Sequence, residues 1–157
     1  MNGVLMHKGT NEQIGYNLYK TGMLVRREAV RCCAGYGITP EQNQILMILS
    51  GIDSASQKQI GEITIQEAPT VSRILKSLAQ RGLISQKREK KDRRAAKVSI
   101  TPAGKALVKK IMPSLKKRFD YVLLGFEERD KKMLIKLLKK LRSVVEKAAE
   151  KHGEEIC

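Results

Sequence analysis

A run of basic residues in the second half of the chain has the clearest chemical character. Of the eleven residues from Lys87 to Lys97, seven are basic and two are acidic. Short β-like runs at 83–85 and 98–100 flank this stretch, so the sequence predicts a hairpin with a cationic tip. Such a tip cannot be part of a core, and it favours contact with a polyanion, of which nucleic acid is the common candidate.

The chemistry of arginine suggests individual roles at this tip. Asp92 lies two residues before Arg94 and can orient its guanidinium. Narrow A·T segments of the minor groove concentrate negative potential, so we expect Arg94 to insert there. We expect Arg93 and Lys91 to contact phosphates. The hairpin residues that we expect to contact DNA are Lys87, Arg88, Lys90, Lys91, Asp92, Arg93 and Arg94. The alternative is an exposed loop that is charged only for solubility.

The elements before the hairpin are predicted to be helices. Capping-box patterns at 39–42 and 56–59 start a helix and a short helix. A third helix is expected over 68–81 and is ended by Gly82. Its apolar residues recur at the spacing of one buried helix face: Val71, Ile74, Leu75 and Leu78. The short helix and the third helix together form a helix-turn-helix, whose second helix enters the major groove of DNA.

The opposite face of the third helix carries the side chains that can read DNA. Arg73 can pair bidentately with guanine, while Lys76 is suited to a phosphate. A plain solvated helix face is the alternative for both residues. The predicted recognition residues are Ala68, Pro69, Thr70, Ser72, Arg73 and Lys76.

Longer helices flank this central region. The first is predicted from about Glu12 to Arg31, with these residues inward or partly inward: Ile14, Tyr16, Leu18, Tyr19, and Leu24 or Val25. The short helix is expected to bury Ile60 and Ile63. A long helix resumes at Pro102, and the last one runs from Glu127 to about Lys151. That last helix carries a seam of coiled-coil spacing, for which the predicted dimerisation residues are Leu134, Leu138, Leu141 and Val145, with Ala148 continuing it.

Composition narrows the class of protein. The chain has 157 residues, 31 basic and 16 acidic, for a net charge of +15. A membrane-surface protein would need an aromatic-rich basic helix, and this chain has no Trp and two Phe. We see no apolar run that could span a bilayer and no signal peptide, so a cytoplasmic protein is expected. No cofactor, metal site or catalytic constellation is indicated, and we expect no enzyme activity.

Several motifs resemble the MarR (multiple antibiotic resistance regulator) family. They are the segment from Gln66 to Leu75, Gly82-Leu83-Ile84, Asp92-Arg93-Arg94-Ala95, and Ile100-Thr101-Pro102-Ala103-Gly104. The resemblance covers roughly residues 39–107. It implies homodimeric winged-helix transcription factors in which the first and last helices form the dimer interface. Many members release DNA when a small, often aromatic or phenolic, ligand binds.

This sequence departs from the family pattern in the hairpin. The family usually has Arg where this chain has Gln86, and Lys90 and Lys91 replace the usual Pro-Glu pair. These changes predict a phosphate contact one residue later. They also predict tighter, less sequence-selective and more salt-sensitive binding.

Two kinds of signal could release the protein from DNA, and the sequence does not decide between them. A ligand pocket between the dimer helices and the DNA-binding lobe would use Tyr16, Tyr19, Arg27, Tyr36 and Met47, which could equally be core or interface residues. Thiol oxidation would use Cys32 or Cys33, if the neighbouring Arg31 lowers a thiol pKa. The peroxide-sensing members of the family carry their cysteine earlier in the first helix.

The sequence therefore predicts a mostly α fold with a small β-hairpin wing (α+β), a winged helix-turn-helix with N- and C-terminal dimerisation helices. Residues 1–157 form a single domain, with a DNA-binding lobe at 38–101 and dimerisation helices at 12–34 and 102–152. The expected function is that of a homodimeric repressor that binds a pseudo-palindromic operator in double-stranded DNA. A sequence-neutral nucleic-acid-binding protein and a thiol-oxidation sensor are the alternatives.

Overall fold

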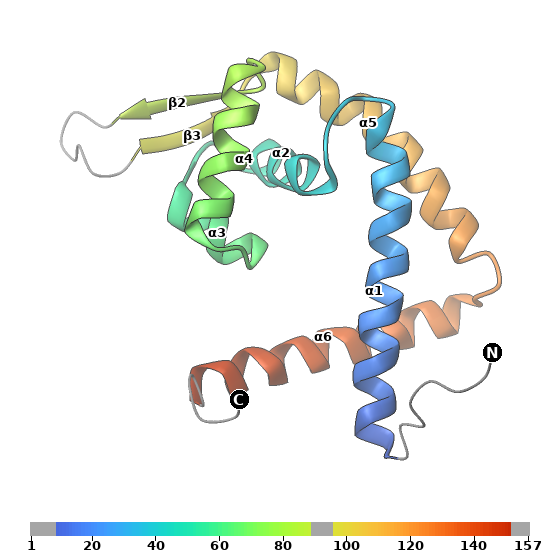
Figure 1. Cartoon of the computed structure of the whole chain (residues 1–157). Helices are drawn as coiled ribbons and strands as arrows, with labels where there is room; N and C mark the ends of the chain where they lie inside the picture. The colour runs from blue at the N-terminus through green and yellow to red at the C-terminus, as the bar shows by residue number, and fades with distance from the viewer. Residues whose placement is uncertain (1–8, 89–95, 152–157) are drawn as a thin grey trace, which may run out of the picture. The chain divides into compact units, whose positions relative to one another are not determined.

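The fold is mostly helical, with one small antiparallel sheet, as the sequence predicts. The computed structural model describes residues 9–88 and 96–151. Figure 1 shows the order of elements: α1 (Thr10–Ala34), α2 (Pro40–Gly51), β1 (Ala55–Ser56), α3 (Gln57–Thr64), α4 (Ala68–Gln80), β2 (Ile84–Arg88), β3 (Ala96–Ile100), α5 (Pro102–Val122) and α6 (Glu128–Lys151). The chain forms two compact units, Met1–Arg118 and Phe119–Cys157, and each is described by itself.

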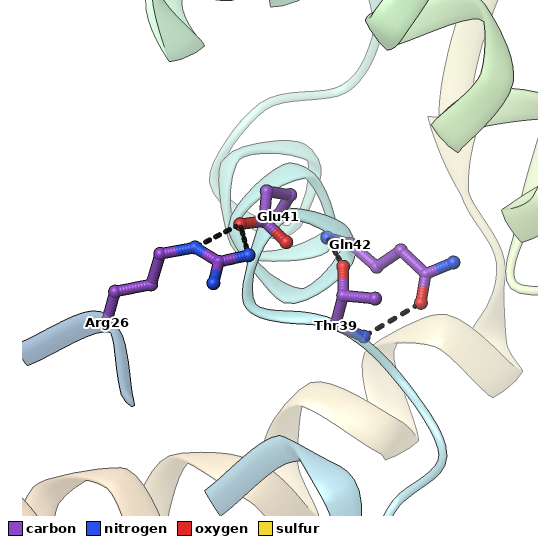
Figure 2. Close-up of polar contacts among 4 residues, drawn as sticks. All are labelled: Arg26, Thr39, Glu41 and Gln42. Carbon is purple, nitrogen blue, oxygen red and sulfur yellow. Dashed lines mark hydrogen bonds and ion pairs between the residues drawn. The ribbon is translucent and has the colours of Figure 1, made fainter. Parts of the chain in front are cut away.

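Both predicted capping boxes are confirmed, and they fix where α2 and α3 begin. The Thr39 hydroxyl accepts from the Gln42 backbone N–H at 3.2 Å, and the Gln42 side chain accepts from the Thr39 N–H at 2.9 Å (Figure 2). Ser56 and Gln59 make the same reciprocal pair at 3.2 and 2.8 Å. Each box satisfies backbone donors that a helix leaves without partners at its start.

The sheet has the strand order β1-β3-β2. β2 and β3 pair antiparallel from Ile84↔Ile100 to Arg88↔Ala96, which confirms the hairpin. β1 adds two residues on the other side of β3, with Ala55 opposite Val98. β1 could not be predicted from the sequence, because a two-residue strand has no periodicity of its own.

The core of the first unit lies among α2, α3, α4 and the sheet. The largest fully buried side chains come from these elements and from α1 and α5: Ile45, Leu46, Leu49, Ile60, Leu75, Leu78, Ile111, Val71, Val98 and Cys33. The apolar face predicted for α4 is confirmed, since Val71, Leu75 and Leu78 are buried. Burial of this face holds the opposite, polar face of α4 outward.

A tight junction joins the sheet to α5. The Thr101 hydroxyl accepts from the Gly104 N–H at 3.1 Å and donates to the Gly82 carbonyl at 2.7 Å. A Cβ at Gly104 would overlap the carbonyl oxygen of Leu83. The Thr and Gly of the Ile100–Gly104 motif thus have a structural role, which is to dock the first turn of α5 on the start of β2.

Some predicted burial is wrong. The predicted burial of Ile60 is confirmed, but Ile63 is 53% exposed, and Thr64 is buried instead. Along α1, all the residues expected to face inward are exposed: Ile14, Tyr16, Leu18, Tyr19, Leu24 and Val25. The spacing of these residues is that of an apolar face, but in the described part of the first unit this face is exposed.

The first unit attaches α1 to its neighbours through ion pairs. Arg26 donates to Glu41 of α2 at 3.0 Å (Figure 2). Glu28 accepts from Arg118 of α5 at 2.6 Å and from Arg31 at 2.8 Å. The hydrogen bond from Arg118 lowers the pKa of Glu28, against the effect of burial, and the nearby arginine charges lower it further.

The second unit consists of the end of α5, a turn near Gly125 and α6. The predicted seam on α6 is confirmed as helical, and its large apolar residues are accessible to solvent, with Leu134 at 38% and Leu138 at 40% exposure. Within the described ranges of the chain, no helix is both long and apolar enough to cross a bilayer.

Candidate nucleic-acid interface

The turn between α3 and α4 sets the helix-turn-helix. Ile65 adopts the left-handed conformation, with φ 54°, directly after α3. The Gln66 N–H then donates to the Gly61 carbonyl at 3.0 Å, and a Cβ at Gly61 would lie 3.0 Å from the Gln66 oxygen. The turn therefore reverses the chain without a glycine at its positive-φ position, and it brings α4 across α3.

The polar face of α4 is open to solvent, as the sequence analysis expects. Ala68, Pro69, Ser72, Arg73 and Lys76 are exposed, and Thr70 is half-buried. Within the described part of the chain, the side chains of Ser72, Arg73 and Lys76 make no hydrogen bond or ion pair. Their donors are thus available to an external partner.

Three side chains hold α4 in place from the positions around it. Gln57 of α3 donates to the Ala68 carbonyl at 3.0 Å, and Gln42 of α2 donates to the Ser77 hydroxyl at 3.0 Å. Arg81 donates to the Gly37 carbonyl at 2.7 Å, in the loop after α1. These contacts could not be predicted from the sequence. Each joins residues that are far apart in the chain, and polar side chains with no distinctive spacing give no signal of their partners.

The hairpin presents a basic surface beside α4. Lys87 of β2 lies directly opposite Lys97 of β3, and Ser85 lies opposite Ser99. Val98 is buried on the other face of the sheet, so the alternation of strand residues directs the two lysines outward. Both lysines are exposed. The strands therefore begin the cationic surface that the sequence predicts for the tip.

Most of the residues predicted to contact DNA from the hairpin lie at its tip. The residues Lys90, Lys91, Asp92, Arg93 and Arg94 lie outside the described residues, and only the backbone of Arg88 is described. Their contacts with DNA stay predictions.

A hollow of about 740 Å³ lies between the helix-turn-helix and the sheet. Gln57 and Gln66 line it from the α3 side, Ala68 from the start of α4, and Gln86 from β2. Gln86, where the family usually has Arg, therefore lies next to the predicted recognition helix. The hollow shows that α4 and the wing border one continuous surface.

The residues predicted for a ligand pocket lie on α1, on α2 and in the loop between them. Tyr36 donates to the Lys110 carbonyl at 3.1 Å and is 3.2 Å from the Ser114 hydroxyl, both on α5. Tyr19 is 70% exposed, and Tyr16, Arg27 and Met47 are also exposed. None of the five lines the hollow described above. Their role in ligand binding stays a prediction.

The two cysteines near the end of α1 differ in environment. Cys33 is fully buried, and burial raises the pKa of its thiol. Arg31, the residue expected to lower a thiol pKa, is paired with Glu28. The predicted lowering of the pKa is therefore wrong for Cys33, because desolvation disfavours the thiolate. Cys32 is partly exposed.

Known proteins share this arrangement. Residues 36–95 match the model of the MarR family. The chain is 26% identical over 121 residues to the uncharacterised HTH-type transcriptional regulator YwoH of Bacillus subtilis, spanning 77% of this chain and 88% of YwoH. It is also 26% identical to a probable transcriptional regulator from Pseudomonas aeruginosa, with a TM-score of 0.76 over 85% of this chain and 99% of that one.

Two further solved structures share the fold. The MepR–DNA complex of Staphylococcus aureus has a TM-score of 0.77 at 21% identity, over 83% of this chain and 96% of MepR. BpsR of Bordetella bronchiseptica, whose structure concerns regulation of its DNA binding by 6-hydroxynicotinic acid, has a TM-score of 0.77 at 22% identity, over 83% and 98%.

The relatives reported above are named as regulators of transcription. The family match covers the helix-turn-helix, β2 and the segment that follows, which are the elements that carry the predicted DNA-reading residues. Over residues 36–95, which include the helix-turn-helix and β2, the chain is thus similar to the MarR family of transcriptional regulators.

Proposed function

We propose that the chain is a homodimeric repressor that binds a pseudo-palindromic operator in double-stranded DNA and is released by a small aromatic or phenolic ligand. The observation that carries the proposal is the outward face of α4, where Ser72, Arg73 and Lys76 are exposed beside the paired lysines of the hairpin. Side chains of these types read base edges and phosphates in the major groove.

The exposed apolar faces of α1 and α6 support a dimer. Large apolar side chains follow one another along both helices, and contiguous exposed patches of this kind are typical of protein–protein interfaces. The spacing of Leu134, Leu138 and Leu141 is that of a helix that packs against another helix. Two protomers related by a two-fold axis would place their recognition helices about 10 base pairs apart, which predicts the pseudo-palindrome.

A ligand-controlled release is supported by the position of Tyr36 and by likeness to BpsR. Tyr36 lies in the loop that Arg81 joins to the end of α4, and its hydroxyl contacts α5. A ligand that displaced Tyr36 would therefore disturb a loop directly bonded to the recognition helix. The structural neighbour BpsR has DNA binding that is regulated by an aromatic acid.

Selection of binding sites from a random DNA library tests this function. The proposal predicts enrichment of one pseudo-palindrome with half-site centres about 10 base pairs apart. A reporter preceded by that site should be expressed less when the protein is present, and a benzoate or phenol from a panel should restore expression. Binding without any enriched sequence would favour the sequence-neutral alternative instead.

A further inference from the structure

Helix α6 carries a dense set of lysines that the winged helix does not account for. Residues 131–145 contain six basic residues and no acidic one. At about 100° per residue, five lysines fall on the face opposite the Leu134–Leu138–Leu141 seam. We call this set the α6 lysine face: Lys132, Lys136, Lys139, Lys140 and Lys147.

The side chains of these five lysines are exposed. In the part of the chain that the structure describes, none of the five forms an ion pair. The contrast on the same helix is Lys131, which binds Glu128 at 2.7 Å. An ordinary solvated helix face alternates the sign of its charges, because i,i+4 pairs of opposite sign stabilise a helix and like pairs destabilise it. Here Lys136 has lysines at both i−4 and i+4.

The dimensions of the face suit a nucleic-acid backbone. From Lys132 to Lys147 the helix rises about 22 Å, and duplex DNA has one phosphate charge per about 1.7 Å of its axis. The face could thus follow the backbone over about six base pairs. We propose that the α6 lysine face is a second DNA-binding surface, which contacts phosphates independently of sequence and separately from the winged helix.

The chemistry favours DNA over an anionic membrane. A helix that binds a membrane surface inserts bulky apolar and aromatic residues beside its basic ones. α6 has no aromatic residue, and the seam leucines Leu134, Leu138 and Leu141 lie on the opposite side of the helix from the lysine face. A phosphate backbone needs only the cations.

The first test compares two triple variants of the full-length protein. One neutralises the lysine face (Lys132→Gln, Lys136→Gln and Lys139→Gln), and the other removes the same charge from α5 (Lys109→Gln, Lys116→Gln and Lys117→Gln). Affinity for a random 30-base-pair duplex is measured by fluorescence anisotropy over a range of salt concentrations. Each lysine that contacts a phosphate should contribute about eightfold at about 0.1 M salt and about 0.9 to the salt slope.

The proposal predicts a much larger loss of affinity and of salt slope in the α6 variant than in the α5 variant. Equal losses would overturn it, since net charge alone would then explain binding. Circular dichroism and sedimentation check that both variants keep the fold and the oligomeric state of the wild-type protein. The ratio of affinities for a selected site and random DNA should not change in the α6 variant, because the face does not read sequence.

A second readout needs no substitution. Acetylation of lysines in the free and DNA-bound protein, followed by mass spectrometry, should show protection of Lys136 and Lys139 but not of Lys116. Unprotected lysines on α6 would overturn the proposal. So would loss of binding to phosphatidylserine vesicles in the α6 variant with unchanged DNA binding, which would assign the face to a membrane.

This inference and the proposed function fail separately. If the winged helix did not read a site, no sequence would be enriched, while the α6 variant would still weaken binding to random DNA. If the α6 lysine face did not bind DNA, site selection would succeed and the α6 variant would bind like the wild-type protein.

Discussion

Lys87 and Lys97 lie directly opposite each other on the two strands of the hairpin, and both side chains are exposed. Like charges at opposed positions of an antiparallel pair destabilise it by a few tenths of a kcal/mol to about 1 kcal/mol. This opposition alone therefore weakens the pairing of the two strands, and a phosphate between the two lysines would reduce their repulsion. The same two charges thus disfavour the pairing of the strands and favour contact with DNA.

Replacing Lys87 with Gln should weaken DNA binding without lowering stability. Loss of the like-charge opposition should leave the melting temperature unchanged or slightly raised. Affinity should fall by a similar factor for every DNA sequence, and the salt slope should decrease by about one unit per lost contact. Anisotropy and thermal unfolding measure the two effects, with Lys116→Gln on α5 as the charge-matched control. A destabilised variant would show that Lys87 has a structural role instead.

Replacing Arg73 should change sequence discrimination. If Arg73 pairs with a guanine, Arg73→Ala should cost about 1–3 kcal/mol at the selected site and much less on random DNA. Arg73→Lys is the matched control for charge, since lysine keeps the cation but loses the bidentate geometry. It should therefore keep affinity for random DNA and still lose discrimination. If Arg73→Ala lost the same affinity for the selected site and for random DNA, Arg73 would contact a phosphate and not a base.

A charge in the α6 seam should prevent dimerisation. Leu138→Lys places a cation on the exposed apolar face, where a partner helix would have to bury it. The variant is expected to sediment as a monomer with a helical circular dichroism spectrum and to lose tight operator binding. Ser143→Lys, which adds the same charge on the opposite face of α6, should stay dimeric. Tight operator binding by a Leu138→Lys monomer would contradict the proposed architecture.

The junction between Leu83 and α5 should not tolerate a methyl group at Gly104. A Cβ there would overlap the Leu83 carbonyl oxygen, so Gly104→Ala should lower the free energy of unfolding by about 1–3 kcal/mol. Gly22→Ala is the control, because a Cβ at that position of α1 would meet nothing within 4 Å beyond its chain neighbours and the backbone of its own helix. In that exposed helix alanine should stabilise by up to about 1 kcal/mol. Urea unfolding of both variants gives the comparison.

Acid should weaken the attachment of α1 through Glu28. Because Arg118 lowers the pKa of Glu28 in the folded protein, the contribution of Glu28 to stability is present above the usual glutamate pKa. It is lost as the pH falls through the lowered value. Melting temperatures measured by circular dichroism between about pH 6 and 3 should therefore fall less steeply in Glu28→Gln than in the wild-type protein.

Part of that acid dependence should remain in the variant. Burial acts to raise the pKa of Glu41, but hydrogen bonds from its own backbone N–H, Thr39 and Arg26 lower it overall. Glu41 thus titrates in the same direction as Glu28. Identical pH profiles for Glu28→Gln and the wild-type protein would show that the Arg118 pair does not contribute.

Local signals made much of the fold predictable from the sequence. A capping box depends only on residues three apart, so the starts of α2 and α3 could be located exactly where Thr39 and Ser56 lie. The apolar spacing of α4 and the glycine at 82 defined the recognition helix in the same way. The polar face of α4, which carries the predicted recognition residues, could be identified from helical periodicity alone.

Features that depend on tertiary contacts could not be predicted in this way. The β1 strand exists only because Ala55 pairs with Val98, and the Lys87–Lys97 opposition depends on strand register. Arg81 gave no signal of its contact with the loop at Gly37, 44 residues away in the chain. The apolar spacing along α1 was recognised, but the predicted burial of its residues was wrong, because burial depends on tertiary contacts that spacing does not reveal.

A dimer that reads one DNA site should distinguish that site from other sequences. This is tested by binding to the selected site and to a scrambled duplex of equal length, at about 50 and 200 mM salt. We expect a gap in affinity of about a thousandfold or more, with two protomers per site. Near-equal affinities that fall together as salt rises would contradict it, because charge alone would then be responsible for binding.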